Sequence, residues 1–424
     1  MAKIKQKIKI EYFFIWGNYP ALALAEILSA FNRWNIRYSI VHASIEACVI
    51  TLDQYLPEEF MDQLGGTIKI GQIIEEQRGK TVDPEIIASY IIKHQPEGKI
   101  FFGLSQYRLN HLSKELTKKT TDSIGKEVKV LLKDSRSIRW VTSKEKNLSS
   151  VVVKKNKLIG VGSEIVLLFH SNKVWIGKTT AVQPFEAYGE RDYGRVVTDA
   201  KVGMLPPKLA QMMLNISGAK PNEIILDPFC GFGTVLQEAM LMGWKHVVGS
   251  DIAKTSVDGT KKNLLWLKKK HQLKSHVIRI FHSDARAISE HVRGGYISTI
   301  VTEPHLGPAL RQKSTKKEAV AKKKELEALY YSTFLDLTKF LRTGARVVIV
   351  WPVFILSSAT PRLIYIDLLE KLEKLGFSLA IPFEKEIKKY RMGGQTTRDT
   401  LIYGRPQQKV WREILVFIYT KKEY

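Results

Sequence analysis

The sequence predicts an α/β protein in which a parallel sheet with helices on both faces fills the C-terminal half and an α+β half precedes it. From about residue 220 onward, apolar segments of strand length alternate with segments of helical periodicity. That order is typical of parallel sheets. Earlier in the chain, short strands and a few helices mix without regular alternation, which is the pattern of α+β domains.

Seven strands are expected in the C-terminal half. They are Ile224–Asp227, Val247–Asp251, Val277–His282, Ile297–Thr302, Arg346–Trp351, Ser378–Pro382 and Glu413–Thr420. Helices are expected between the first six, at Thr234–Leu241, Val257–Lys270, Lys317–Leu341 and Arg362–Leu375, with a shorter one near Ala285–His291. We expect a loop and a hairpin-like return, not a helix, between the last two strands.

The first half is expected to hold fewer regular elements. Its helices are Ala21–Phe31 and Pro84–His94, and its later strands are Lys99–Gly103, Val151–Val153, Glu164–Phe169 and Lys173–Ala181. These patterns predict an N-terminal α+β domain over residues 1–60, a second α+β domain over 61–180, a linker and entry segment over 181–219 and the parallel-sheet domain over 220–424.

The charge balance is the unusual feature of the composition. Lys and Arg number 66 against 42 Asp and Glu, a formal net charge of +24. A polyanion is the natural partner of such a chain, and nucleic acid is the commonest one. Basic residues concentrate between residues 114 and 157, interleaved with Ser, Thr and aromatic residues: Lys114, Lys118, Lys119, Lys126, Lys129, Lys133, Arg136, Arg139, Lys144, Lys146, Lys154, Lys155 and Lys157. The alternative is a solvated basic surface.

The cellular compartment is predicted from two features. Only two cysteines occur, Cys48 and Cys230, which excludes a disulfide framework and a CxxC metal site and favours a reducing compartment. The longest apolar stretch, Ala345 to Leu356, is too short for a bilayer and contains Arg346 and Pro352. We therefore expect a cytoplasmic protein with no metal and no membrane span.

The stretch from Asp227 to Thr234 carries the clearest ligand signal. A strand ends in a carboxylate and a turn with Gly231 and Gly233, and a helix begins at Thr234. Glycines allow close approach to a ligand, and the helix start offers unpaired N–H groups. The three glycines of a dinucleotide fingerprint are not here, and the acid would repel a pyrophosphate. A ligand with an ammonium group fits better, and S-adenosylmethionine (AdoMet) carries one.

Four acids stand at successive strand ends: Asp227, Asp251, Asp284 and Glu303. The carboxyl ends of parallel strands line one crevice, so all four can face one pocket. Asp251 is placed to reach a ribose diol, and Asp284 to accept from an adenine amino group. The alternative is the ordinary frequency of Asp in turns.

Glu303 and Pro304 are residues of the type that an amino methyltransferase needs to activate its target nitrogen. The lone pair of an exocyclic base nitrogen is delocalised into the ring, so the nitrogen is a poor nucleophile. A side-chain acceptor and a rigid backbone carbonyl, both hydrogen-bonded to the NH₂ group, counter this and take the departing proton. An acid followed by proline supplies both. The alternative is a strand terminator without chemistry.

At these motifs the chain resembles the THUMP-domain tRNA guanine-N2 methyltransferases, over nearly its whole length. The segment Asp-Pro-Phe-Cys-Gly from Asp227 is similar to their AdoMet loop. Upstream, Arg191 to Arg195 and Met204 to Ala210 are similar to the segment that enters the methyltransferase domain and contacts the methionine end. The resemblance implies a Rossmann-like seven-stranded methyltransferase domain behind an N-terminal α+β domain and a THUMP-like domain. The cofactor-binding residues it implies are Pro207, Asp227, Phe229, Gly231, Gly233, Thr234, Asp251, Ile252, Asp284 and Ala285.

The catalytic motif departs from the family's Thr-Asp-Pro-Pro-Tyr-Gly, because this chain has Thr-Glu-Pro-His-Leu-Gly from Thr302 to Gly307. Glu303 is one methylene longer than the usual acid. Leu306 replaces the tyrosine that would stack on the base, which should weaken base capture unless His305 supplies a ring. The expected catalytic residues are Glu303, Pro304 and His305.

The sequence as a whole predicts an AdoMet-dependent tRNA methyltransferase acting on an exocyclic base nitrogen, with guanosine N2 at tRNA position ten as the family's typical target. Two other functions remain open. One is a DNA amino methyltransferase acting on adenine N6 or cytosine N4, which would share the acid-proline motif. The other is a non-catalytic RNA-binding protein that retains the methyltransferase fold.

Overall fold

The structure is a computed structural model that describes residues 9–79, 81–95, 97–110, 118–198, 204–307, 315–356, 363–405 and 407–421. It divides into two compact units. The first comprises Met1–Ala23, Trp34–Glu186 and Glu386–Gly393, and the second comprises Leu24–Arg33, Ala187–Lys385 and Gly394–Tyr424. Helix α1 (Pro20–Arg33) is therefore divided between them.

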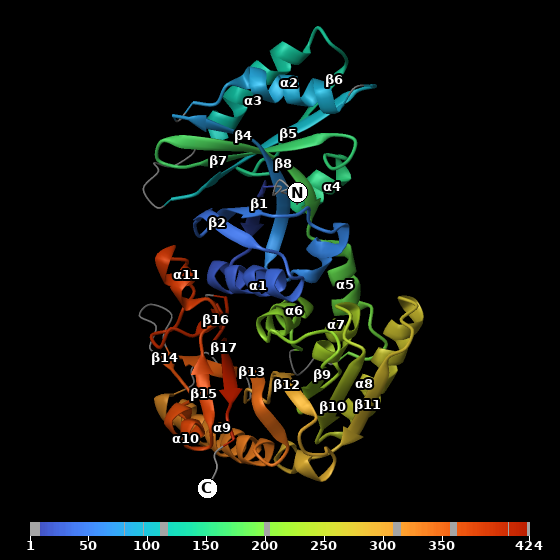
Figure 1. Ribbon diagram of the computed structural model, residues 1–424, viewed down its shortest axis with the longest axis vertical. Helices are drawn as coiled ribbons and strands as arrows, with labels where there is room; N and C mark the ends of the chain where they lie inside the picture. Colours follow the sequence, from blue (N-terminus) through green and yellow to red (C-terminus); the bar gives the residue numbers. More distant parts are fainter. Residues whose placement is uncertain are drawn as a thin grey trace, which may run out of the picture. The chain divides into compact units, whose positions relative to one another are not determined.

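An eight-stranded sheet forms the first unit, in the order β2-β3-β1-β4-β8-β7-β5-β6. Most of these strands are labelled in Figure 1. Its strands are β1 (Ile10–Trp16), β2 (Tyr38–Ala43), β3 (Ala47–Leu52), β4 (Thr67–Arg78), β5 (Ile100–Arg108), β6 (Ile138–Val141), β7 (Ser163–Phe169) and β8 (Lys173–Val182). Its further helices are η1 (Glu58–Gln63), α2 (Pro84–His94), α3 (Lys118–Leu132) and α4 (Ser150–Lys155). Apolar side chains of α2 and α3 pack with β5, β7 and β8 in one buried cluster.

Helix α2 confirms the helix predicted at Pro84–His94. Asp83 caps its start and proline occupies its first turn, and both favour a helix that begins here. The strand predicted at Val151–Val153 is wrong, since these residues lie in α4. The hydroxyl of Ser149 accepts from the Val152 amide at 3.3 Å and starts a helical turn. This cap overrides the strand preference of three β-branched residues.

The predicted border between residues 60 and 61 falls within a region whose strands share the first sheet. Strand β4, beyond the border, pairs with β1 on one side and with β8 on the other. Whether residues 1–60 and 61–180 are separate domains stays a prediction.

The second unit contains a nine-stranded sheet, in the order β11-β10-β9-β12-β13-β17-β15, with β14 paired to β13 and β16 to β17. The strands are β9 (Ile224–Asp227), β10 (His246–Asp251), β11 (Val277–His282), β12 (Ile297–Thr302), β13 (Leu341–Ile355), β14 (Leu363–Ile364), β15 (Phe377–Ala380), β16 (Leu401–Tyr403) and β17 (Val410–Tyr419). The pairs from β11 to β13 are parallel, and β17 is antiparallel to both β13 and β15. The predicted α/β fold class is confirmed.

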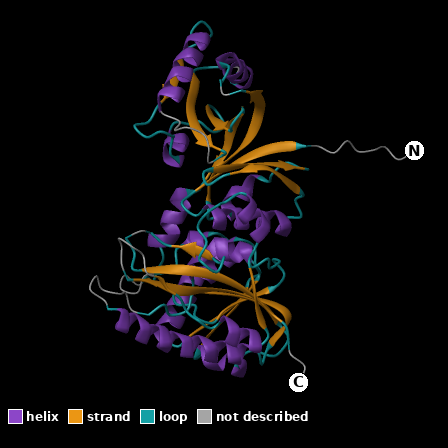
Figure 2. Ribbon diagram, turned by 90° about the vertical axis from the view of Figure 1, so that its left-hand side faces the viewer, coloured by secondary structure: helices purple, strands orange, loops and turns teal. Residues whose placement is uncertain are grey.

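Helices cover both faces of this sheet (Figure 2). They are α5 (Phe185–Tyr193), α6 (Pro207–Ile216), α7 (Thr234–Leu241), α8 (Lys254–Lys270), η2 (Ala285–Glu290), α9 (Lys316–Leu337) and α10 (Leu369–Lys374). Helix α11 (Glu384–Lys389) is divided between the two units. On one face, η2, α9 and α10 enclose the main core with Trp351 and Phe417 of the sheet. A capping box of Thr315 and Glu318 starts α9. No helix among the described ranges is long and apolar enough to cross a membrane.

Two predictions for the end of the chain are wrong in part. The expected helix Arg362–Leu375 is helical only in α10, because Leu363 and Ile364 pair with β13 as β14; Arg362 lies outside the described residues. The expected loop before the last strand contains α11 and β16. Elements α11, β14 and β16 are each too short to give a periodic pattern in the sequence. Strands β14 and β16 are stabilised by pairing with the longer strands β13 and β17.

Candidate active site

The carboxyl ends of β9, β10, β11 and β12 bring the four predicted acids to one edge of the sheet. The Thr302 hydroxyl donates to Asp227 Oδ1 at 2.6 Å, which ties the end of β12 to the end of β9. The Gly231 amide donates to Asp251 Oδ2 at 2.9 Å, which ties the glycine turn to the end of β10. Because these strands are adjacent and parallel, the turn and the acids lie at the same edge of the sheet, the edge at which open parallel sheets bind ligands.

The glycine turn needs glycine at two positions. Gly231 and Gly233 have φ values of 50° and 84°, in the left-handed region that L side chains rarely adopt. A Cβ on Gly233 would lie 2.9 Å from Thr260 Cγ2, whereas one on Gly231 would meet nothing within 4 Å. The backbone of Gly231 therefore borders open space, as close approach of a ligand requires.

Asp227 is buried behind this turn. Its Oδ1 accepts from the Phe229 amide at 3.1 Å as well as from Thr302. Burial raises the pKa of Asp227 to about 7, and the neighbouring Asp251 and Glu303 carboxylates act in the same direction. An ammonium ligand would favour the ionised form, so this carboxyl suits a cationic partner.

Asp251 uses one lone pair of each carboxylate oxygen to shape the backbone. Its Oδ1 accepts from the Ala253 amide at 2.8 Å, while Oδ2 accepts from Gly231. The remaining lone pairs suit two ribose hydroxyls. The next side chain, Ile252, is 65% exposed. An exposed aliphatic side chain at this position offers an apolar face to a purine ring.

Asp284 is already engaged by Arg286. Its side chain caps η2 through the Arg286 amide at 2.9 Å, and both oxygens accept from the Arg286 guanidinium. These hydrogen bonds lower the pKa of Asp284. An adenine amino group would have to share the Asp284 carboxylate with Arg286. The adjacent residue, Ala285, is buried.

The entry segment is bound to the helix that follows the glycine turn. Arg195 Nη1 donates to Thr234 Oγ1 at 2.7 Å, and Arg191 Nε donates to buried Glu238 at 2.8 Å. Pro207 is buried at the first turn of α6. The sequence pointed to this segment only through the family resemblance, and it did not predict the buried contacts of the two arginines.

The acid-proline motif begins where β12 ends. The Glu303 side chain is largely buried, Pro304 is buried and the His305 side chain is exposed. The Tyr330 hydroxyl of α9 donates to the His305 carbonyl at 2.7 Å, which holds the motif's backbone. Arg412 of β17 binds the Glu303 carboxylate through two guanidinium nitrogens. Neither Tyr330 nor Arg412 was predicted, since only the fold brings them to the motif.

Phe232, in the glycine turn, packs against helix α8. Its ring lies against Gly259 of α8, where an added Cβ would come within 2.6 Å of the ring. The bulk of Phe232 is therefore accommodated by the absence of a side chain on α8.

A second candidate surface lies in the first unit, where the basic residues concentrate. Eight of them are exposed: Lys126, Lys129, Lys133, Arg139, Lys144, Lys154, Lys155 and Lys157. Arg136 and Lys146 are half-buried, Lys114 lies outside the described residues, and nothing is described for the side chains of Lys118 and Lys119.

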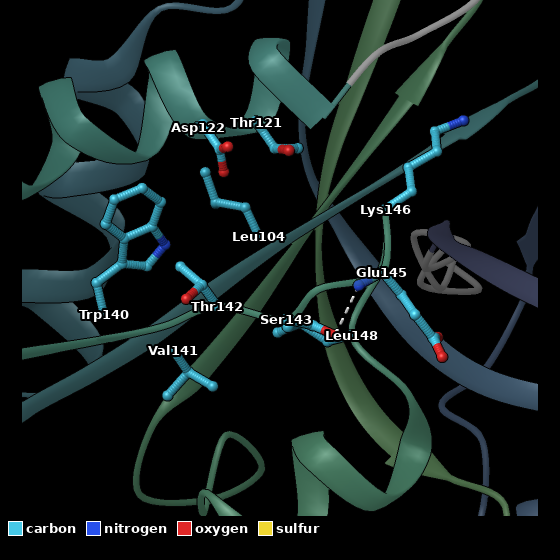
Figure 3. Close-up of a pocket in the computed structure, with 10 residues that line it drawn as sticks. All are labelled: Leu104, Thr121, Asp122, Trp140, Val141, Thr142, Ser143, Glu145, Lys146 and Leu148. Carbon is cyan, nitrogen blue, oxygen red and sulfur yellow. Dashed lines mark hydrogen bonds between the residues drawn. The ribbon is translucent and has the colours of Figure 1, made fainter.

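A hollow opens beside these basic residues, between the first turns of α3 and the chain that follows β6 (Figure 3). Trp140 lines one side of it and lies parallel to Phe102, with ring centroids 6.1 Å apart. Thr121 and Asp122 of α3 and Lys146 of the loop also line it. Leu104, Val141 and Leu148 line it as well, so the hollow is part polar and part apolar, with one aromatic wall.

A buried ion pair fixes the loop that carries Lys144 and Lys146. The ammonium of Lys69 binds the Glu164 carboxylate and donates to the Leu148 carbonyl at 2.6 Å. Ser105 Oγ accepts from the Leu148 amide at 3.1 Å. Because Lys69 and Glu164 are almost fully buried, these bonds give the loop a defined place on the sheet.

Comparison with known proteins finds similarity in part of the second unit. Residues 195–353 match the family UPF0020, described as an RMKL-like methyltransferase domain. The chain is 38% identical over 134 residues to a tRNA (guanine(10)-N2)-dimethyltransferase of Methanothermobacter thermautotrophicus, covering 32% of this chain and 34% of the relative. It is 30% identical over 214 residues to the Pyrococcus abyssi enzyme of the same name, covering 50% and 60%. The matches thus span about a third and three fifths of these curated relatives.

A solved structure shares the fold over almost the whole chain. TrmN from Thermus thermophilus aligns with a TM-score of 0.53 at 14% identity, covering 96% of this chain and 99% of that one. At this identity the likeness concerns the fold alone. In sequence, residues 195–353 match an RMKL-like methyltransferase domain, and the chain is similar to tRNA (guanine(10)-N2)-dimethyltransferases, as the resemblance of its motifs led us to expect.

Proposed function

We propose that this protein is a cytoplasmic, AdoMet-dependent tRNA methyltransferase. Its target is N2 of a guanosine at position ten of the tRNA. One observation carries the proposal. The glycine turn with its acids and the Glu303-Pro304 motif meet at one edge of the second sheet, where Thr302 is bonded to Asp227. The names of the two curated relatives supply the base and the nucleic acid.

The residues present fit AdoMet. The open space at Gly231, the buried Asp227 and the exposed Ile252 suit a close backbone contact, an ammonium group and a purine face. Asp251 would hold the ribose, Asp284 the adenine amino group, and Phe229, Gly233, Thr234, Ala285 and Pro207 would complete the walls. When bound, AdoMet supplies an electrophilic methyl group on a sulfonium.

Glu303 and Pro304 would prepare the base nitrogen. The Glu303 carboxylate and the Pro304 carbonyl would accept the two hydrogens of the guanine amino group, which orients its lone pair toward the methyl carbon. Glu303 would then take the proton that the methylated nitrogen releases. Tyr330 holds the next carbonyl, that of His305, so the motif's backbone is already in place before a base arrives.

The raised pKa of Asp227 predicts a pH dependence of cofactor binding. Only the ionised carboxylate attracts the ammonium group, so affinity should rise about 8-fold between about pH 6 and pH 7.5. The stability of the ligand-free protein depends on pH in the opposite direction. Its Asp227 pKa lies above the ordinary 3.8, so this group's contribution to the free energy of unfolding falls as the pH rises toward about 7.

Calorimetric titration of AdoMet across that range measures the effect. Asp227→Asn carries no titrating carboxyl at this site and should bind weakly at every pH, without the rise. An equal rise in wild type and Asp227→Asn would assign the titration to another group.

The basic surface of the first unit is proposed to bind the tRNA backbone. The tRNA affinity of the full chain should fall at least about 100-fold between about 50 and 200 mM salt. Lys126→Glu combined with Lys129→Glu, on exposed positions of α3, should reduce the slope by about one for each phosphate that the variant no longer neutralises.

The matched control is Lys261→Glu combined with Lys262→Glu, on exposed positions of α8 in the second unit. Filter binding at several salt concentrations measures all three proteins. If tRNA binding does not depend on salt, or if the two double variants change it equally, the α3 surface is a solvated basic surface and not a tRNA-binding one.

Nucleoside mass spectrometry tests the function itself. tRNA from cells with the gene should contain N2-methylated guanosine that is missing from cells without it, and the purified protein should restore it with AdoMet. Methylated adenine or cytosine in DNA would instead support the DNA amino methyltransferase. Binding of tRNA without methylation of any base would support the non-catalytic alternative.

A further inference from the structure

The carboxylate assigned to the base is held by a partner far away in the sequence. Arg412 Nε binds Glu303 Oε2, and Arg412 Nη2 donates to Glu303 Oε1 at 3.1 Å. This is the bidentate geometry of an arginine and a carboxylate, which fixes direction as well as distance. The side chains are only 14% and 11% exposed, so water screens the pair weakly.

The sheet delivers Arg412 to this position. Glu303 follows β12 and Arg412 lies near the start of β17, with β13 between the two strands. Arg412 is opposite Pro352, close to the carboxyl end of β13. The next residue, Glu413, is fully buried and ion-paired with Arg398, which locks the register of β17.

The pair leaves Glu303 able to act on a base. A carboxylate offers about four lone-pair directions, and the arginine takes two of them. Among the described residues, Glu303 makes no hydrogen bond besides those with Arg412. A glutamate has one more rotatable bond than the family's aspartate, so an unheld carboxylate would sample more orientations.

We propose that Arg412 is a positioning residue for Glu303: it holds one edge of the carboxylate so that the other edge faces the amino group of the target base. This proposal rests on the proposed function. It gives the longer acid a structural reason, since an arginine on β17 restricts the side chain that the extra methylene loosens. Arg412 then acts on the chemical step and only through Glu303.

A double-mutant cycle separates this role from others. Arg412→Met, Glu303→Ala and the combined variant are compared with wild type in single-turnover methylation of tRNA isolated from cells lacking the gene. Arg412→Met should slow the step about 10-fold or more. The combined variant should be no slower than Glu303→Ala. Arg412→Lys should recover only part of the rate, because an ammonium cannot bind both oxygens in a fixed plane.

Arg342→Met is the matched control. Arg342 forms an ion pair with Glu223 at 2.8 Å near the start of β13, at the opposite edge of the sheet from the motif. It should leave the methylation rate unchanged. AdoMet affinity and the KM for tRNA should be unchanged in Arg412→Met, and its melting temperature shows whether the fold survives.

The outcomes are distinct. A further loss when Arg412→Met is added to Glu303→Ala would overturn the proposal, since Arg412 would then act independently, for instance on an RNA phosphate. Wild-type rates in Arg412→Met would overturn it too, and the proposed function would stand. If the wild-type protein methylates no tRNA, the proposed function fails and the positioning role fails with it.

Discussion

Glu303→Ala is expected to lower the single-turnover rate of tRNA methylation roughly 10²-fold or more, a typical contribution of a positioned proton acceptor. Alanine removes the acceptor of the amino hydrogens and the group that would take the released proton. At a pH well above the Asp227 pKa of about 7, AdoMet affinity should not change, because Asp227 is then ionised in both proteins and Glu303 follows β12 whereas the predicted ribose ligand, Asp251, ends β10. Rapid quench of a methyl-labelled reaction measures the rate, and calorimetry measures the affinity.

Glu303→Gln serves as the graded control for this prediction. Its amide oxygen still accepts a hydrogen bond but is a much weaker base, so partial activity is expected. The same change breaks the charge pairing with Arg412, and this should reduce activity below that of a simple loss of basicity. Full activity of Glu303→Ala would exclude the assigned catalytic role.

His305 stands where the family has its second proline, and the structure sharpens the test of its role. Its side chain is exposed while its carbonyl is bound by Tyr330. A ring in this place is free to stack on an extruded base, so His305→Ala should raise the KM for tRNA more than it lowers kcat. Equal KM values in the two proteins would assign base stacking to another side chain.

Most of the candidate site could be predicted because its signals are local. A strand, a carboxylate, a glycine turn and a helix start follow one another within about ten residues, as β9 and α7 show. Their proximity in space follows from parallel strand order, which places successive carboxyl ends together. Asp227, Asp251, Asp284 and Glu303 therefore meet at one sheet edge, as expected, although their roles toward a cofactor stay predictions.

Apart from Arg286, which binds Asp284 two residues away, the side-chain partners that were missed are long-range. Arg412 is 109 residues from Glu303, and the link depends on β17 being inserted beside β13. Arg195 reaches Thr234 across 39 residues, through a segment without strong periodicity. Partners of this kind are set by register and packing, so a sequence pattern holds no local trace of them.

The errors in secondary structure have the same origin. Val151–Val153 is a strand by propensity, but the Ser149 cap and the burial of Val153 between Leu148 and Leu158 give a helical turn. Leu363 and Ile364 continue a helical pattern in the sequence, yet β13 extends far enough to pair with them. In both places tertiary contacts override local preference.

Asp251→Ala is expected to weaken AdoMet binding at least about tenfold, or about 1.4 kcal/mol, because two hydrogen bonds from ribose hydroxyls to a charged acceptor are removed. The structure adds a second reason. The same carboxylate accepts from the amides of Gly231 and Ala253, so alanine also frees the glycine turn from the end of β10. The demethylated product should lose affinity by a similar factor, since it carries the same ribose.

Asp251→Asn separates the two contributions. Its amide oxygen can replace one acceptor, but its NH₂ group cannot accept from a backbone amide or a hydroxyl, so binding should be intermediate. A 2′-deoxyribose analogue of the demethylated product isolates the hydrogen bond to the ribose. Wild type should bind this analogue more weakly than the product, whereas Asp251→Ala should bind the two ligands with equal affinity. If Asp251→Ala still discriminates between the two ligands as wild type does, the ribose is held elsewhere and Asp251 only shapes the turn.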